Sequence, residues 1–161
     1  MVEQNQELPT VEAPRGMYPS RLDDKGRAKM PAPFQQYFAS LREKKLFVTS
    51  LDRRIAQIYP MAVWRKNEKF FDTYREDPKA ARKVAFNAAD LGAEAEMDAQ
   101  GRILFSTELR RELGLENATI RLFAYRERIE VLSEKEYDER KREASTTAPE
   151  DVAKLESAGL V

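Results

Sequence analysis

The residues best suited to chemistry in this chain form a short pattern that occurs twice, 75 positions apart. Residues 22–27 read Leu-Asp-Asp-Lys-Gly-Arg, and residues 97–102 read Met-Asp-Ala-Gln-Gly-Arg. Each copy has an Asp four residues before an Arg and a Gly directly before that Arg. Across a tight turn the Asp can orient the Arg, whose planar guanidinium then offers two donors to a phosphate or a guanine edge. The alternative is an ion pair that only stabilises the turn, and both interpretations can hold together.

We assign the turn-orienting role to Asp23 and Gly26 in the first copy and to Asp98 and Gly101 in the second. Each Gly is free to take the positive φ that a tight turn requires. Because a duplicated unit constrains a fold strongly, the repeat also indicates how the chain is built.

Basic side chains surround the first turn more densely than the second. Residues 15–29 contain only two acidic residues and five basic ones, namely Arg15, Arg21, Lys25, Arg27 and Lys29. Arg102 stands among acidic residues at positions 94, 96 and 98. We therefore expect the first turn to contribute more to binding a polyanion. The alternative interpretation is an ordinary solvated face of a strand.

The formal net charge of zero over 161 residues conceals an uneven distribution. Residues 15–66 hold 12 Lys and Arg against 4 Asp and Glu, a net charge of +8. Residues 67–92 are balanced, residues 93–142 carry −2, and residues 1–14 and 143–161 carry −3 each. One lobe is therefore basic enough to attract a polyanion, and the other is not.

The composition excludes several chemistries. The chain has no Cys and no His, so thiol nucleophiles, disulfides, Ser-His-Asp arrangements and His-ligated or thiolate-ligated metal sites are impossible. We expect no metal, no cofactor and no enzymatic activity. No apolar run approaches the roughly 20 residues that cross a bilayer, and the acidic start is unlike a signal peptide, so we expect a soluble cytoplasmic protein without membrane contact.

Each turn is followed by a similar series of expected elements. After the first turn we expect a short strand, a helix with an apolar stripe at Phe34, Phe38 and Leu41, and a hairpin around residues 52–54. After the second we expect a strand, a helix ended by Gly114, and a hairpin around residues 126–127. Helices are also expected over 62–75 and 78–90, and from a capping box formed by Ser133 and Glu136.

These elements predict five segments. They are a flexible acidic tail over 1–14, a first repeat over 15–66, connecting helices over 67–92, a second repeat over 93–142, and a flexible tail over 143–161 with at most a transient helix. One such small repeat cannot bury both faces of its strands. Two repeats related by a pseudo-twofold axis can interlock their hairpins into one closed barrel, so the expected fold class is α+β.

Two further groups of residues receive structural rather than functional interpretations. The aromatic residues Tyr59, Trp64, Phe70, Phe71 and Tyr74 could form a base-stacking platform, but their spacing favours packing in the core and between helices. The arginine pairs at 53–54 and 110–111 are interpreted as solvated surface.

The stretch from Gly16 to Tyr137 resembles the MraZ family of bacterial regulators in the AbrB/MazE-like superfamily. The resemblance is carried by LDDKGRAKMP (22–31), IYPMAVW (58–64), GAEAEMDAQGRILF (92–105) and LRRELGL (109–115). It implies a double-split β-barrel of two AbrB-like repeats with swapped hairpins, and a ring-like homo-oligomer. It also implies a nucleoid-associated transcriptional regulator that binds double-stranded DNA at guanine-rich direct repeats upstream of the division and cell-wall gene cluster.

In the family, the Arg of the repeated motif contacts DNA, which implies this role for Arg27 and Arg102. Lys25 and Gln100 occupy matching turn positions and are expected to help, and the basic residues Arg15 and Lys29 complete the candidate set. The chain departs from the family pattern at Phe105-Ser106, where Ile-Pro is usual, so a different strand exit is expected there.

Two other functions stay open from the sequence. The same barrel could bind another protein, as an antitoxin-like or scaffold module. The basic lobe could instead bind RNA without sequence preference. Salt-dependent binding to duplex DNA separates the first from a DNA-binding regulator, and competition between duplex DNA and RNA separates the second.

Overall fold

The computed structural model describes residues 12–161, and 1–11 of the expected acidic tail lie outside the described residues. The chain has the predicted α+β class, with an antiparallel sheet and six helices between residues 12 and 161. In chain order the elements are β1 Met17–Arg21, β2 Arg27–Lys29, α1 Ala32–Ser40, β3 Leu46–Thr49, β4 Ala56–Pro60, α2 Met61–Thr73, α3 Pro78–Leu91, β5 Ala93–Ala95, β6 Arg102–Leu104, α4 Thr107–Leu113, β7 Thr119–Tyr125, β8 Arg128–Ser133, α5 Glu134–Thr146 and α6 Ala148–Ala158.

Strands from the two halves of the chain alternate in space. Six strands form one antiparallel sheet in the order β1-β7-β8-β4-β3-β5, and β2 pairs with β6 in a separate two-stranded ribbon. Exchanging each strand for its counterpart in the other half (β1 with β5, β3 with β7, β4 with β8) reproduces the same order from the opposite edge. Neither half completes the sheet alone, because β1 pairs with β7 and β4 pairs with β8.

The predicted closed barrel is not confirmed. Within residues 12–161 the hydrogen-bonded ladders leave the six-stranded sheet open, with β1 at one edge and β5 at the other. The chain leaves the sheet after β1 and after β5, and only a single bridge between Leu22 and Ala28 links the β1 side to the ribbon. The short ribbon therefore caps the sheet as a separate ladder.

The main core lies between the sheet, the ribbon, α1 and α4. The helix stripe expected from the sequence is present, since Phe34 and Phe38 are buried and Leu41 packs against them. Leu109 is the buried counterpart on α4, which Gly114 ends at φ 66 as predicted. Ala28 and Ile103 of the ribbon are also fully buried, so the ribbon is anchored through one of its two faces.

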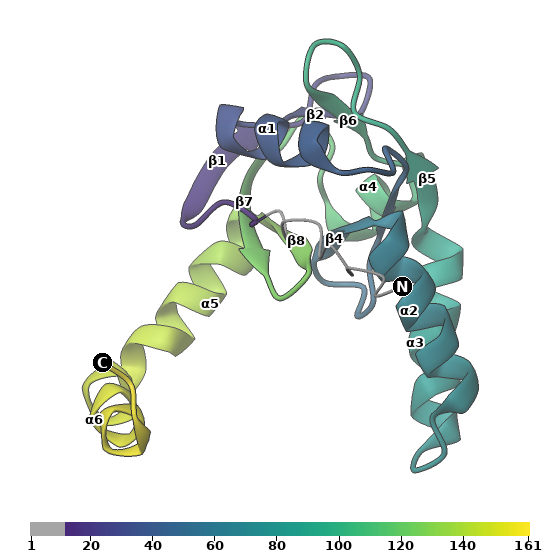
Figure 1. Cartoon of the computed structure of the whole chain (residues 1–161). Coiled ribbons are helices and arrows are strands. Elements are labelled where there is room, and N and C mark those ends of the chain that lie inside the picture. Colours follow the sequence, from purple (N-terminus) through teal and green to yellow (C-terminus); the bar gives the residue numbers. More distant parts are fainter. Residues whose placement is uncertain (1–11) are drawn as a thin grey trace, which may run out of the picture.

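Two helical arms extend from the opposite side of the molecule (Figure 1). Helices α2 and α3 form one arm, and α5 continues from β8 into the other, with α6 at its end. Trp64 stacks on Phe47 at a ring-centroid distance of 4.6 Å and lies 5.0 Å from Tyr59, which confirms aromatic packing for these residues. Phe70 is 53% exposed, so the prediction of aromatic packing does not extend fully to it. No helix within 12–161 combines the length and apolar character needed to cross a membrane.

The C-terminal segment contains more helix than the sequence interpretation allows. Helix α5 begins with the predicted cap, in which the Ser133 hydroxyl accepts from the backbone N–H of Glu136 at 3.2 Å. It reaches Thr146, and α6 follows, so residues 143–161 differ from the expected tail with at most a transient helix. Pro149 in the first turn and two acidic residues beside it favour this helix, because they suit its positively polarised N-terminus.

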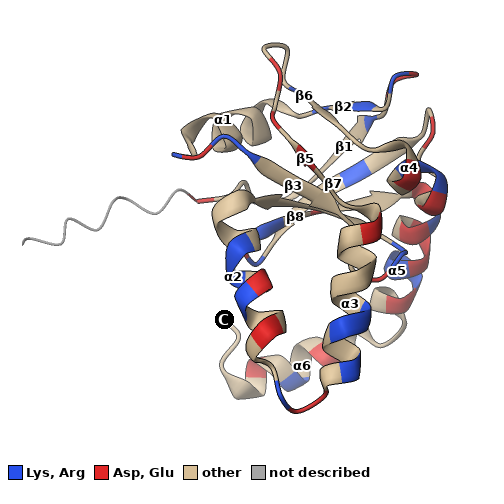
Figure 2. Ribbon diagram, turned by 90° about the vertical axis from the view of Figure 1, so that its right-hand side faces the viewer, with Lys and Arg blue, Asp and Glu red and all other residues tan. Residues whose placement is uncertain are grey.

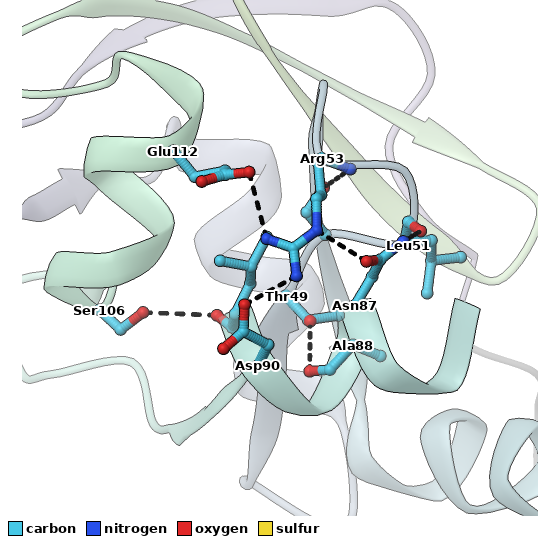
Figure 3. A network of polar contacts seen from close by, with 10 residues as sticks. Thr49, Leu51, Arg53, Asn87, Ala88, Asp90, Ser106 and Glu112 are labelled. Atoms are coloured by element: carbon cyan, nitrogen blue, oxygen red, sulfur yellow. Dashed lines mark hydrogen bonds and ion pairs between the residues drawn. The ribbon is translucent and has the colours of Figure 1, made fainter. Parts of the chain in front are cut away.

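Arg53, in the turn between β3 and β4, ties that hairpin to α3 and α4 (Figure 3). Its Nε donates to Asn87 Oδ1 at 2.7 Å, and its Nη2 donates to Asp90 Oδ2 at 2.7 Å. Its Nη1 donates to Glu112 Oε1 at 3.1 Å. The interpretation of Arg53 as solvated surface is wrong, because three elements converge around its guanidinium. This contact fixes α4 relative to α3.

The ribbon provides a test of the packing. We expect Ile103→Ala to lower the free energy of unfolding by about 2–5 kcal/mol, because it opens a cavity under the ribbon. Leu104→Ala, one residue further on, should change it by less than about 0.5 kcal/mol, since Leu104 is 54% exposed. Urea unfolding of both variants measures the difference. Equal losses would contradict the assignment of the two ribbon faces.

Candidate nucleic-acid interface

The first turn is organised by the carboxylate of Asp23. Asp23 Oδ1 accepts from the backbone N–H of Lys25 at 3.0 Å and from that of Arg27 at 2.9 Å, and Oδ2 accepts from Arg27 Nε at 2.9 Å. The backbone closes the turn through Gly26 N to Asp23 O at 3.1 Å and Asp23 N to Arg27 O at 2.9 Å. Gly26 has φ 81, which only Gly adopts readily. The Asp therefore orders the turn and orients the Arg.

The second turn repeats these contacts with the same atoms. Asp98 Oδ1 accepts from the backbone N–H groups of Gln100 and Arg102 at 2.9 Å each, and Oδ2 accepts from Arg102 Nε at 2.9 Å. Gly101 has φ 77. The structure thus places all four turn-orienting residues as the sequence interpretation requires.

These hydrogen bonds keep both carboxylates ionised. The backbone N–H of Arg27 contributes most to lowering the pKa of Asp23 below the ordinary 3.8, burial opposes it, and the Arg27 side chain also lowers it. The pKa of Asp98 is lowered in the same way, first by the backbone N–H of Arg102. A lowered folded pKa stabilises the turn above the ordinary value, and the stabilisation is lost as the pH falls through the lower folded value. At neutral pH both arginines are held.

The orientation of each Arg leaves one edge of its guanidinium for a ligand. Nε of Arg27 and of Arg102 is engaged by the Asp of its own turn, and the described residues provide no hydrogen-bond partner for the Nη atoms. Both side chains are about a quarter exposed. Two Nη donors without a partner in the described residues suit a planar bidentate acceptor such as a phosphate or a guanine edge.

The ribbon brings the two arginines onto one surface. In its antiparallel register Arg27 lies opposite Leu104, and Lys29 lies opposite Arg102. Because directly opposed residues share a face and alternate residues in a strand do too, all four side chains point outward. Arg27 and Arg102 are diagonal neighbours, about 7–8 Å apart between their Cα atoms. We call this outward surface, made of Arg27, Lys29, Arg102 and Leu104, the ribbon face.

Each turn is held by the other half of the chain. The backbone N–H of Met30 donates to Gly101 O at 2.8 Å, and that of Phe105 donates to Gly26 O at 2.9 Å. Lys29 Nζ also donates to Gln100 O. Both turns project at the end of the molecule away from the helical arms (Figure 1). The ribbon face and its turns therefore form one rigid, protruding unit.

A side chain from the opposite half covers the Gly of each turn. A Cβ built on Gly26 would lie 2.3 Å from the guanidinium of Arg110 on α4, and one on Gly101 would lie 2.3 Å from the amide of Gln35 on α1. Arg110 is held by Nη2 to Thr107 Oγ1 at 3.1 Å. The interpretation of Arg110 as solvated surface is therefore wrong, because it packs on the first turn.

The remaining predicted binding residues divide into two groups. Lys25 and Gln100 are exposed at the tips of their turns, and Lys29 lies on the ribbon face. Arg15 is not brought together with them. It precedes β1, whose five residues separate it from the turn by roughly 17 Å, and it pairs with Glu12 at 3.3 Å.

Leu104 and Arg110 were missed as candidate binding residues. The sequence did contain a signal for both, because adding 75 to Lys29 and to Gln35 gives Leu104 and Arg110. The difference from the family's strand exit stays a prediction, but within this chain the two strand exits are alike. Pro31 (φ −57, ψ 153) and Ser106 (φ −62, ψ 155) have nearly the same backbone conformation, and Ser106 adds a side-chain cap on α4.

Charge is mixed elsewhere on the molecule. Figure 2 shows basic and acidic residues side by side along α2 and α5, whereas α3 has its basic residues in the first half and one acidic residue near its end. Lys66 lies 3.6 Å from Glu127, an acid from outside residues 15–66, so part of the +8 excess is neutralised at α2. The excess positive charge of the first lobe does not form one continuous face.

Comparisons with known proteins agree on one family. A family model described as "MraZ protein, putative antitoxin-like" matches residues 91–156. "Transcriptional regulator MraZ" of Acidobacterium capsulatum is 31% identical over 146 residues, which cover 91% of this chain and 99% of that protein. The proteins of the same name from Koribacter versatilis (33%, covering 60% of this chain and 66% of that protein) and Thermomicrobium roseum (36%, covering 65% and 71%) are also similar.

The covering of Gly26 can be tested against a matched glycine. Gly114 also has a positive φ of 66, but a Cβ there meets nothing within 4 Å. We expect Gly114→Ala to cost about 1–2 kcal/mol from the left-handed conformation alone. Gly26→Ala should cost about 1 kcal/mol more, because it displaces Arg110 from its hydrogen bonds. Urea unfolding gives the costs, and faster exchange of Arg110 Nε–H in the Gly26 variant reports the displacement. Identical behaviour of the two variants would show that Arg110 does not cover the turn.

Proposed function

The chain belongs to the MraZ family, and from this premise we propose that it is a DNA-binding transcriptional regulator. One observation carries the proposal. Two arginines, each oriented by an Asp of its own turn, lie on one outward face of a protruding two-stranded ribbon. The names of the relatives support the same function.

The dimensions of the ribbon fit the major groove of duplex DNA. That groove admits a two-stranded β-ribbon, and an Arg that presents two donors pairs best with guanine O6 and N7. The diagonal separation of Arg27 and Arg102, about 7–8 Å, corresponds to roughly two base-pair steps of 3.4 Å. In this proposal the two Nη edges read guanines near one another, while Lys25, Lys29 and Gln100 contact phosphates or neighbouring bases. The deep, narrow major groove of RNA duplexes would exclude the ribbon.

The family resemblance makes the proposal more specific. We infer that the operator consists of guanine-rich direct repeats upstream of the division and cell-wall gene cluster, and that the protein acts at the nucleoid in the cytoplasm. The ribbon and the six-stranded sheet would together represent the double-split barrel of two AbrB-like repeats. No enzymatic activity and no cofactor enter this mechanism.

We further propose that several copies associate into a ring. Apolar side chains exposed on the helical arms support association, since Phe86 on α3 is 65% exposed and Leu155 on α6 is 55% exposed. The arms lie away from the turns, so contacts between copies through them would leave every ribbon face free (Figure 1). A ring would present several weak sites at fixed spacing and bind tandem repeats with raised effective concentration.

DNA binding is tested by removing the two oriented arginines. We expect Arg27→Ala and Arg102→Ala each to weaken binding to guanine-rich tandem repeats by about 1–3 kcal/mol for each lost guanine contact. The loss should be greater for Arg27, because the first turn is more basic. Arg75→Ala, an exposed arginine between α2 and α3, is the matched control. Gel shifts at several salt concentrations, with duplex RNA as competitor, measure the effect. Wild-type affinity in both turn variants would reject the proposal.

Association through the arms is tested on α6. We expect Leu155→Glu to reduce the mass of the native assembly, because a carboxylate would have to be desolvated in an apolar contact. Lys154→Glu changes the adjacent residue to the same side chain and is the control. Native mass spectrometry and sedimentation measure the number of copies. A wild-type protein that remains monomeric at micromolar concentration would contradict the ring.

A further inference from the structure

We propose that Arg110, carried by the second half of the chain, is a DNA-phosphate-binding residue of the first turn. This inference rests on the proposed function and adds a residue and an asymmetry to the ribbon face. The guanidinium of Arg110 packs directly on Gly26, which lies between Lys25 and Arg27 in the chain. Consecutive Cα atoms are about 3.8 Å apart, so two cationic residues of the turn flank the Gly that the third covers.

Arg110 differs from the two turn arginines in its charge partners. Arg27 and Arg102 each pair with an Asp at 2.9 Å, whereas Arg110 makes no ion pair within residues 12–161. Its hydrogen bonds go to neutral acceptors, Thr107 Oγ1 at 3.1 Å and, more weakly, Ser106 O at 3.4 Å. A half-buried cation held in place without a counter-charge provides a fixed site for an anion at low entropic cost.

The residue that covers the second turn shows whether covering a turn requires a charge. Gln35 takes the place of Arg110 there, packs on Gly101 in the same way and donates to Met30 O at 2.8 Å. A neutral side chain therefore suffices to cover the Gly of a turn. Because the covering role does not require a charge, the cation at the first turn is available for binding.

The neighbouring groups indicate phosphate rather than base as the ligand. Nε and Nη2 of Arg110 are engaged by the start of α4, so it cannot present the same free edge as Arg27. It covers the buried Gly26, whereas Arg27 and Lys29 point outward, so Arg110 is not part of the ribbon face itself. A cation beside a ribbon that lies in the major groove faces the sugar-phosphate backbone at the groove edge.

The test replaces Arg110 by Gln, the residue type that covers the Gly of the second turn. Arg110→Gln should retain the fold and lower the slope of log affinity against log salt by about 0.9 for each bound subunit, which at 0.1 M salt is a loss of roughly eightfold. Arg110→Lys should preserve the slope. Arg111→Gln removes the same charge from the adjacent exposed residue and should leave the slope unchanged.

The DNA probes separate this inference from the proposed function. A guanine-rich tandem duplex and a random-sequence duplex should show the same loss in Arg110→Gln, because phosphate contacts carry no sequence information. A wild-type protein without salt-dependent binding to either duplex would reject the proposed function itself. Wild-type binding with an unchanged slope in Arg110→Gln, or an equal loss in Arg111→Gln, would overturn only the role of Arg110.

A measurement on the unmodified protein does not depend on the folding of a variant. In ¹H–¹⁵N spectra, the Nε resonance of Arg110 should shift when the random-sequence duplex is added, and that of Arg111 should not. An unperturbed Arg110 resonance at saturating DNA would reject the contact.

Discussion

The candidate interface depends on the pairing of β2 with β6 across the two halves of the chain. Each three-residue strand is too short to be stable alone. The pairing buries Ala28 and Ile103 beneath the ribbon and directs the alternate side chains outward. Two reciprocal backbone hydrogen bonds then attach each turn to the other half, at 2.8 and 2.9 Å. Without the β2–β6 pairing, the two arginines would lie on independent loops. Their positions would then have to be ordered on binding, which lowers affinity.

Near-identical backbones carry different side chains at the two turns. The Asp and Arg are the same in both, down to their hydrogen-bonding atoms. The second half replaces Lys29 by Leu104 on the ribbon face, and α1 supplies Gln35 where α4 supplies Arg110. Because the halves cover one another, the cationic cover on the first turn comes from the more acidic second half of the chain. The two turns therefore share one backbone structure but differ in charge, the first being the more basic.

The sequence predicted those features that are local or repeated. The elements that follow each turn, the cap at Ser133, the end of a helix at Gly114 and the α+β class follow from patterns within a few residues or from the duplication itself. Apart from the helix α6 in the expected tail, what failed were contacts between distant segments. Arg53 and Arg110 each stand beside a second Arg in the sequence and were therefore interpreted as solvated. Their partners come from distant segments and approach them only in the folded chain. Arg15 was likewise grouped with the turn because it lies nearby in the sequence, but β1 separates the two by its full length.

The same distant contacts connect the two functional ends of the molecule. Helix α4 bears Arg110 on the turn and, two residues later, Glu112 against Arg53. Arg53 in turn binds Asn87 and Asp90 on α3, which belongs to one helical arm (Figure 3). Residues two apart point to roughly opposite sides of a helix, so this seven-residue helix contacts the turn with one side and Arg53 with the other. The helix that carries the cation over the first turn is thus connected through Glu112 and Arg53 to α3, in the arm that is proposed to join neighbouring copies.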